Sequence, residues 1–309
     1  MRVGITLATA GILAVGIATA AVAGVGTAGG QVLQDSFGPR AAAMAGAFAA
    51  QSGGLDSVGF NPAGLAGLEK VDIQFMHAAG VENMGTEWFA AGVPVPSLAN
   101  LAAQILYRGQ PAIDNGVAGE GGVESKELFF GISLARPIAA GISAGINAKM
   151  LSLTLGPANA SALVFDLGAQ YQLLENTRLG VSVRNLGESV KFHETADPLP
   201  TVATVAGLWT PFLEGTHKVN LEADADYQTT EQNRVARAGM EYWFKNLLAM
   251  RLGYAYSATR SVGGFSAGVG FRFKLTVGVN MNLDYSLQPQ SWEDADFELV
   301  NRIGLGINF

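Results

Sequence analysis

Apolar and polar residues alternate along most of the chain after residue 71. In "KVNLEADADY" (218–227) every odd position is apolar, and the even positions carry Lys, Asn, Glu and Asp. The same alternation runs through "KLTVGVNMNLDYSL" (274–287) and "RIGLGINF" (302–309). A period of two over this length predicts β-strands with one apolar and one polar face.

Fourteen segments follow this pattern, and an even number suits a single-chain barrel with both termini on one side of a membrane. A count of twelve is the alternative, because the segment 102–107 is short. The predicted strand cores are 71–78, 87–93, 102–107, 128–136, 138–150, 162–172, 176–185, 201–210, 216–227, 234–244, 248–257, 262–273, 275–287 and 297–309.

Two all-β architectures produce such strands, a soluble sandwich and a transmembrane β-barrel. Only 15% of the residues are charged, against about a quarter in an average soluble domain. Aromatic residues near strand ends would form the girdles of a barrel, and Phe309 ends the chain in phase with the apolar face. These aromatic residues are Trp209, Tyr227, Tyr242 and Trp243. The pattern therefore favours an antiparallel outer-membrane β-barrel of about 14 strands.

Composition removes several classes of function. The chain has no Cys, which excludes disulfides, thiolate nucleophiles and zinc–thiolate sites. Its net charge is −7, whereas a nucleic-acid-binding protein is basic, so no nucleic-acid partner is expected.

The first 23 residues have the layout of a signal peptide. One basic residue, Arg2, precedes an uncharged apolar run that ends in Ala21-Val22-Ala23. A second possible cleavage position follows Ala28, and a membrane anchor is the alternative to a signal. We therefore predict an exported chain with three parts: a signal peptide (1–23), an N-terminal plug (24–70) and a transmembrane barrel (71–309).

The predicted plug is rich in small residues and shows little strand character. Residues 39–50 favour a helix, because a Pro begins the run and Gly53 and Gly54 follow it. The Asn61-Pro62 step starts a turn or short helix, and nearby glycines allow close backbone packing. A barrel of about 14 strands is too wide for its own side chains to fill, so this helical segment is expected to lie in the lumen as a plug that joins the wall after residue 70.

Several stretches resemble the PorV/PorQ group of outer-membrane proteins, which is similar to the FadL-type channels for hydrocarbons and fatty acids. The resemblance rests on a Gly-x-Arg-Ala run (38–41), a Met-x-Gly-Ala-Phe-like step (44–48) and an Asn-Pro-Ala-Gly-Leu knot (61–65). Two departures are Ala45, where the family often has Gly, and "AQSGGLDS" (50–57), where it usually has an Asp-rich stretch. The plug residues that carry the resemblance are Gly38, Arg40, Met44, Gly46, Phe48, Asn61, Pro62 and Gly64. Later matches are "LGVSVRNLGESVKF" (179–192), "DPLPTVATVAGLW" (197–209) and "ARAGMEYWFKNLLAMRLGYAYS" (236–257).

The resemblance implies one of two roles. The first is passage of hydrophobic, fatty-acid-like molecules across the outer membrane, with Phe48 and Phe60 as apolar ligand contacts. The second is a type IX secretion component that docks exported cargo proteins through its outer loops, chiefly the Gly-rich stretch 108–127. The expected partners are outer-membrane lipid, a hydrophobic solute or a cargo protein, and the barrel assembly machinery through Phe309, with the chain as a monomer.

No enzyme, cofactor or metal site is predicted. "GISAG" (141–145) and "GFSAG" (264–268) match the nucleophile-elbow spacing, but both lie in alternating strands. "GVGTAG" (24–29) matches the dinucleotide fingerprint but follows the signal segment, not a core strand. The three histidines, His77, His193 and His217, are not clustered as zinc ligands would be.

The polar faces of the predicted strands carry charges that would line the lumen. These candidate lumen charges are Arg184, Glu222, Asp224, Asp226, Arg237 and Arg251. The general expectation is that they pair with each other and with the plug. The sharper hypothesis is that Arg40 pairs with the acidic row 222–226 and latches the plug to the wall.

Overall fold

The computed structural model describes residues 28–80, 84–113, 122–192, 196–259, 261–289 and 299–309. The predicted signal peptide, its cleavage positions and the string "GVGTAG" therefore lie wholly or largely outside the described residues. In the part of the chain that is described, no helix is long and apolar enough to cross a membrane.

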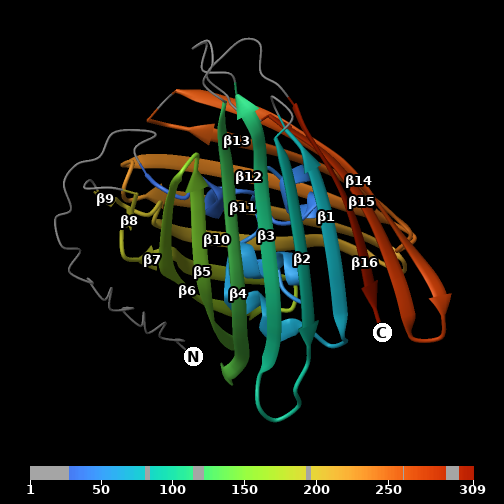
Figure 1. Ribbon diagram of the computed structural model, residues 1–309. Coiled ribbons are helices and arrows are strands. Elements are labelled where there is room, and N and C mark those ends of the chain that lie inside the picture. Colours follow the sequence, from blue (N-terminus) through green and yellow to red (C-terminus); the bar gives the residue numbers. More distant parts are fainter. Residues whose placement is uncertain (1–27, 81–83, 114–121, 193–195, 260, 290–298) are drawn as a thin grey trace.

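Fourteen antiparallel strands form a closed barrel, which confirms the fold class and the strand count (Figure 1). Each strand pairs with the next wall strand along the chain, and β1 closes the barrel against β16. The wall strands are β1 (Asp72–Ala79), β2 (Gly85–Val93), β3 (Asn100–Ile113), β4 (Val123–Ala139), β5 (Ile142–Leu155), β6 (Ala158–Leu174), β7 (Thr177–Gly187), β10 (Val202–Glu214), β11 (His217–Gln228), β12 (Asn233–Phe244), β13 (Leu248–Ser257), β14 (Val262–Thr276), β15 (Val279–Pro289) and β16 (Leu299–Asn308).

The period of two places the apolar face outside and the polar face inside. In β11, Glu222 and Asp224 are buried in the lumen, while Ala223 between them and Ala225 after them are exposed. In β4, Phe130 and Ile132 are exposed on the outer surface. This arrangement suits a wall whose outer face meets lipid.

The two ends of the barrel differ. The end that holds Phe309 and the short turns is called the lower end, and the opposite end, where β3 ends and β4 begins, is called the upper end (Figure 1). The backbone of Phe309 exchanges two hydrogen bonds with Val71, at 3.0 and 3.1 Å, so the chain closes its own seam at the lower end.

Two features of the upper end differ from the prediction. β3 and β4 extend to Ile113 and from Val123, so most of the stretch 108–127 is strand and the connection is shorter than expected. Between β7 and β10 the chain adds a small sheet of β8 (Val190–Lys191) and β9 (Ala196–Asp197). Two-residue strands are too short for alternation to predict.

Trp243 does not join an outer aromatic girdle as predicted. Its side chain is 7% exposed and faces the lumen, where the guanidinium carbons of Arg251 and Arg272 lie 5.6 and 4.4 Å from its ring centre. Trp209 and Tyr227 do lie on the outer surface, at 50% and 40% exposure. Trp243 follows the strict alternation of β12, which sets its face whatever its residue type.

The segment from residue 28 to 70 lies inside the barrel and is called the plug. It contains four short helices: η1 (Gln31–Gln34), α1 (Pro39–Ala43), η2 (Leu55–Gly59) and η3 (Pro62–Gly67). The helix expected over 39–50 is wrong beyond Ala43, because Ala45 and Gly46 take left-handed backbone angles, with φ of 55° and 77°. A left-handed pair cannot continue a right-handed helix.

Candidate functional site

The plug contacts the wall on two sides through different elements. Helix α1 packs against β13–β16, and η3 packs against β3–β6. Most plug residues between Val32 and Leu65 are buried, so the plug occupies the lumen instead of lying across one end. This interface between plug and wall is the candidate functional site.

Asn61 connects η3 to the wall. Its Oδ1 accepts a hydrogen bond from the backbone N–H of Ala63 and so caps η3. Its Nδ2 donates to the carbonyl of Ala49 at 2.8 Å, and lies 3.1 and 3.2 Å from the carbonyls of Ala169 and Val181 on β6 and β7. The Asn-Pro step thus starts a short helix, one of the two forms predicted from the sequence, and it also ties the plug to the middle of the wall.

Inward-facing glycines of the wall leave space for the plug backbone. A Cβ added at Gly168 would lie 1.9 Å from Asn61 Oδ1, and one at Gly145 would lie 2.4 Å from the carbonyl carbon of Pro62. The same holds on the other side, where a Cβ at Gly253 would lie 2.2 Å from the Met44 backbone. Real Cβ atoms do not approach this closely, so these glycines shape sockets for the plug.

The acidic row of β11 binds the plug through backbone amides. Asp224 Oδ2 accepts hydrogen bonds from the N–H groups of Phe48 and Ala49, at 2.9 and 3.0 Å. Glu222 accepts from the N–H of Ala50 at 2.7 Å and from the side chain of Gln51 at 2.8 Å. Consecutive amides that follow a left-handed turn form a concave donor site that suits carboxylate oxygens.

Arg40 does not pair with this row, so the latch hypothesis names the wrong partner. Its guanidinium donates two hydrogen bonds, of 2.7 and 2.8 Å, to the carboxylate of Glu241 on β12. Arg251 Nε binds the same carboxylate at 2.8 Å, and Arg251 Nη1 continues to Asp284 at 2.6 Å. Glu241 is fully buried, and its charge is shared between an arginine of the plug and one of the wall.

The other predicted lumen charges all contact partners inside the barrel. Arg237 pairs with Asp226 at 2.8 Å and donates to the carbonyl of Ala45 at 2.8 Å. Arg184 donates to the carbonyl of Gly59 at 2.9 Å. Two wall arginines therefore bind carbonyl groups of the plug, while two wall carboxylates bind its amides.

The other side of the lumen is apolar toward the upper end, and below this part β5 and β6 carry the buried ion pair Lys149–Asp166. Phe37 of the plug makes edge contacts with Phe129 on β4 and Trp88 on β2, with ring centres 5.7 and 6.4 Å apart. Phe48 and Phe60, the predicted ligand contacts, lie 5.5 Å apart in the same cluster and are 1% and 6% exposed. The wall residues of this apolar side are Met76, Trp88, Leu106, Phe129, Leu151, Leu153, Ala160, Ala162 and Val164.

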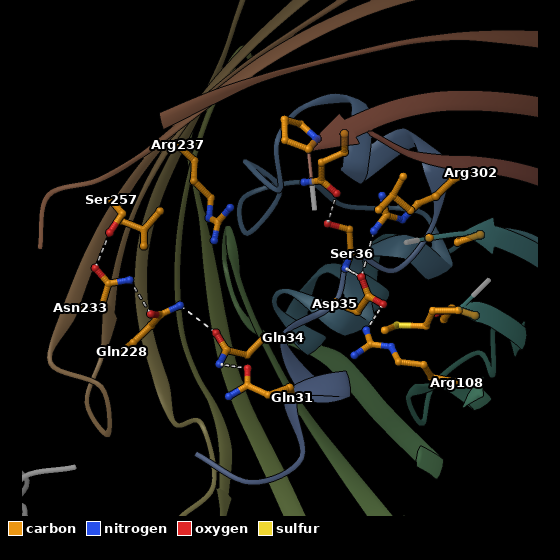
Figure 2. A pocket seen from close by; sticks show the side chains of 18 of the residues that line it. Gln31, Gln34, Asp35, Ser36, Arg108, Gln228, Asn233, Arg237, Ser257 and Arg302 are labelled. Atoms are coloured by element: carbon orange, nitrogen blue, oxygen red, sulfur yellow. Dashed lines mark hydrogen bonds and ion pairs between the residues drawn. The ribbon is translucent and has the colours of Figure 1, made fainter. Parts of the chain in front are cut away.

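A polar cavity of about 450 Å³ opens between the plug and the upper end of the wall (Figure 2). On one side lies a chain of hydrogen-bonded side chains: Gln31, Gln34, Gln228, Asn233 and Ser257. On the other side, Asp35 of the plug lies between Arg108 of β3 and Arg302 of β16. Burial raises the pKa of Asp35, but the two guanidinium charges outweigh it and lower the pKa to about 2.

A smaller cavity of about 110 Å³ lies below the plug, near the lower end. Asp56 of η2 borders it together with Arg40, Asp72, Arg251 and Asp284. Burial raises the pKa of Asp56 to about 7, although Arg40 and Arg251 oppose the shift.

The other sequence matches do not assemble into a reactive site. Ser143 and Ser266 lie inside β5 and β14, without the strand-to-helix turn of a nucleophile elbow. His77 contacts Glu87 on the outer face, His217 contacts Tyr242, and His193 lies outside the described residues. No group of three potential metal ligands occurs in the described ranges.

Sequence reasoning missed four residues that organise this site, namely Asp35, Glu241, Asp284 and Arg302. Glu241 and Arg302 could have been found, because both lie on the polar face of alternating strands. The glycines inside strands were a further signal, since glycine in a strand interior marks a close backbone approach. Asp35 lies in the small-residue segment and carries no periodic signal.

Comparison with known proteins shows likeness in structure only. No protein-family model and no curated protein sequence matches the chain. The Ralstonia pickettii toluene transporter TbuX superposes with a TM-score of 0.58 at 15% identity, over 88% of this chain and 97% of that one. The P. putida toluene transporter TodX gives 0.59 at 12% identity, over 89% and 97%. CymD, a monoaromatic hydrocarbon channel, gives 0.61 at 13% identity, over 88% and 96%.

A Pseudomonas aeruginosa FadL homologue also superposes, with a TM-score of 0.54 at 11% identity. At these identities the likeness concerns the fold. The barrel thus shares its fold with these proteins.

Proposed function

We propose that this protein is an outer-membrane channel that passes small hydrophobic molecules when its plug moves. The observation that carries the proposal is the apolar side of the lumen, formed by the wall residues from Met76 to Val164 named above. The plug now covers these side chains with Phe37, Phe48 and Phe60. A plug displaced toward the polar side would uncover these apolar side chains, which extend from the upper end down to the ion pair Lys149–Asp166.

Three further points support the proposal. The outer surface of the wall is apolar, as a membrane-spanning barrel requires. The fold resembles that of two toluene transporters and a monoaromatic hydrocarbon channel. The plug is one short segment held by side-chain contacts, so it can move without breaking the barrel. In this proposal the upper end faces the cell exterior, and the lower end, where β1 begins and β16 ends, faces the periplasm.

The test is uptake of toluene by intact Gram-negative cells that express the full chain, compared with cells that lack it. We expect faster toluene entry and unchanged entry of glycerol. Leu151→Thr, which places a hydroxyl on the apolar side, should slow toluene entry. Leu155→Thr in the same strand is the control, because Leu155 is 49% exposed. Equal toluene entry with and without the protein would refute the proposal.

The sequence resemblance to PorV/PorQ proteins supports a second role, the docking of secreted cargo. The stretch proposed to carry it is 108–127, of which residues 114–121 lie outside the described residues. Deletion of residues 114–121 should abolish cargo capture and spare toluene uptake if the second role holds.

A further inference from the structure

The clamp around Asp35 contains more guanidinium donors than its acceptors satisfy. Arg302 Nη2 donates to Asp35 Oδ1 at 3.0 Å, and Arg108 binds the other carboxylate oxygen. Arg302 is only 5% exposed, and its Nε and Nη1 atoms are buried without a hydrogen-bond partner, as is Nε of Arg108. A buried N–H group without an acceptor costs about 1–3 kcal/mol, so this cluster favours a further acceptor.

The two arginines of the clamp differ in their acidic partners. Asp35 supplies one negative charge to two guanidinium groups. Arg108 has a second, longer contact with Glu127 at 3.3 Å, whereas Asp35 is the acidic partner of Arg302 in the described part of the chain. A planar guanidinium fork with free N–H groups matches a carboxylate in two-point contact.

The remaining lining of the cavity determines what kind of molecule could carry that carboxylate. Amide and hydroxyl side chains surround the clamp on the plug and on β11, β13 and β15: Gln31, Gln34, Ser36, Gln228, Ser257 and Gln288. Such groups form hydrogen bonds with hydroxyl groups of a ligand. An alkyl chain would remove water from them and offer no hydrogen bond in its place. The cavity of about 450 Å³ has room for a small organic acid.

We infer that this cavity binds a small, hydroxylated carboxylate, which takes the place of the Asp35 carboxylate between Arg108 and Arg302. Asp35 acts as a tethered occupant of the site, since it stays ionised at neutral pH and belongs to the plug. A free carboxylate that displaces it can bind Arg302 in two-point contact, which pairs one further donor of that guanidinium, and releases η1 and the residues that follow it. The cavity is thus an effector site on the polar side, separate from the apolar path of the proposed function.

The test measures binding and plug release on the purified full-length protein in detergent. The binding probe is gluconate, followed by calorimetry, with octanoate and glucose for comparison. Because the chain has no Cys, a Val32→Cys thiol in η1 reports release through its rate of reaction with a small maleimide. Val32 is fully buried when the plug is anchored. We expect gluconate to bind in the millimolar range or tighter and to accelerate labelling, and octanoate and glucose to do neither.

Two variants and one control separate the clamp from general effects. Arg302→Gln should weaken gluconate binding at least tenfold, and Asp35→Asn should strengthen it at least tenfold and accelerate labelling without ligand. Arg234→Gln changes an exposed arginine at the same end of the barrel and should change neither. Circular dichroism confirms folding of each variant.

Other outcomes overturn the inference. These are no saturable gluconate binding up to about 10 mM, tighter binding of octanoate, or an affinity that Asp35→Asn leaves unchanged or lowers. Toluene uptake is read separately, so failure of this site leaves the proposed transport function standing, and the reverse also holds.

Discussion

The two sides of the lumen hold the same plug by different physics. On the side of β11–β16, the contacts are charged hydrogen bonds: Arg40 to Glu241, and the amides of residues 48–50 to Glu222 and Asp224. On the side of β2–β6, aromatic and aliphatic packing around Phe37 and Phe129 combines with hydrogen bonds from the neutral amides of Asn100 and Gln170 to plug carbonyl groups. Charged hydrogen bonds depend steeply on distance and direction, whereas apolar contacts tolerate sliding.

This difference suggests how one segment can block a channel and still move. Charged contacts hold residues 40–51 on one side, whereas Asn61 and the glycine sockets hold residues 61–65 on the other. Changes to the polar side should therefore release the plug, while changes of volume at the glycine sockets should misplace it. Hydrogen exchange of plug amides, read by mass spectrometry, distinguishes the two outcomes.

The largest effect is expected from Glu241→Gln. The change leaves Arg40 and Arg251 inside the lumen without their shared charge, and breaking a buried ion pair by removing one partner costs about 3–5 kcal/mol. Amides of residues 39–51 should lose protection, and those of residues 61–65 should change less. Glu214→Gln, at an exposed strand end, is the matched control. An equal loss of amide protection in both stretches would show that the plug moves as one rigid body, and that the two sides of the lumen do not hold it independently.

A smaller effect is expected from Gly168→Ala. The added methyl group would overlap Asn61 Oδ1, and overpacking of this kind costs about 1–3 kcal/mol. Protection should now fall first in residues 61–65, the reverse of the pattern for Glu241→Gln. Gly306→Ala is the control, because its methyl group would meet its nearest neighbour at an ordinary 3.5 Å. A comparable loss of amide protection in Gly168→Ala and Gly306→Ala would show that Gly168 is not required for the fit of the plug.

A pH effect of at least about tenfold, or about 1.4 kcal/mol, is expected at Asp56. Burial raises its pKa from 3.8 to about 7, so the docked plug holds a proton there that the undocked plug releases. Docking is therefore strongest below about pH 4 and weakens as the pH rises to about 7. The measurement is protection of residues 55–59 after correction for intrinsic exchange, and Asp56→Asn should remove the slope. A plug that docks more firmly as the pH rises would contradict this assignment.

The smallest effect, of the opposite sign, is expected from Ala45→Gly. Ala45 has a left-handed φ of 55°, which costs about 1–2 kcal/mol for a residue with a side chain and little for glycine. The variant should protect residues 44–48 more strongly by up to about 1 kcal/mol, since the flexible glycine also loses more entropy on ordering. Lower protection would show that the methyl group packs usefully against its neighbours.

Much of the wall could be predicted from the sequence because a strand's side chains have a strict period. The alternation through Glu222, Asp224 and Asp226 gave the correct face for each residue, whereas Trp243, predicted from its residue type to lie in the outer girdle, follows the alternation of β12 and faces the lumen. The plug could not be predicted in the same way. Its helices are four to six residues long, and a left-handed turn follows α1, so no period develops.

The sequence by itself determined a barrel of about 14 strands, an apolar outer face and a set of charges facing inward. Only the tertiary structure decided which of those charges meet. Arg40 lies 201 positions from Glu241, and Asp35 lies 73 and 267 positions from its two arginines. The reason is physical: alternation fixes the face of a residue, whereas its partner depends on how far along the lumen the plug reaches. That depth is set by the glycine sockets and by Asn61, whose contacts have no counterpart in local sequence.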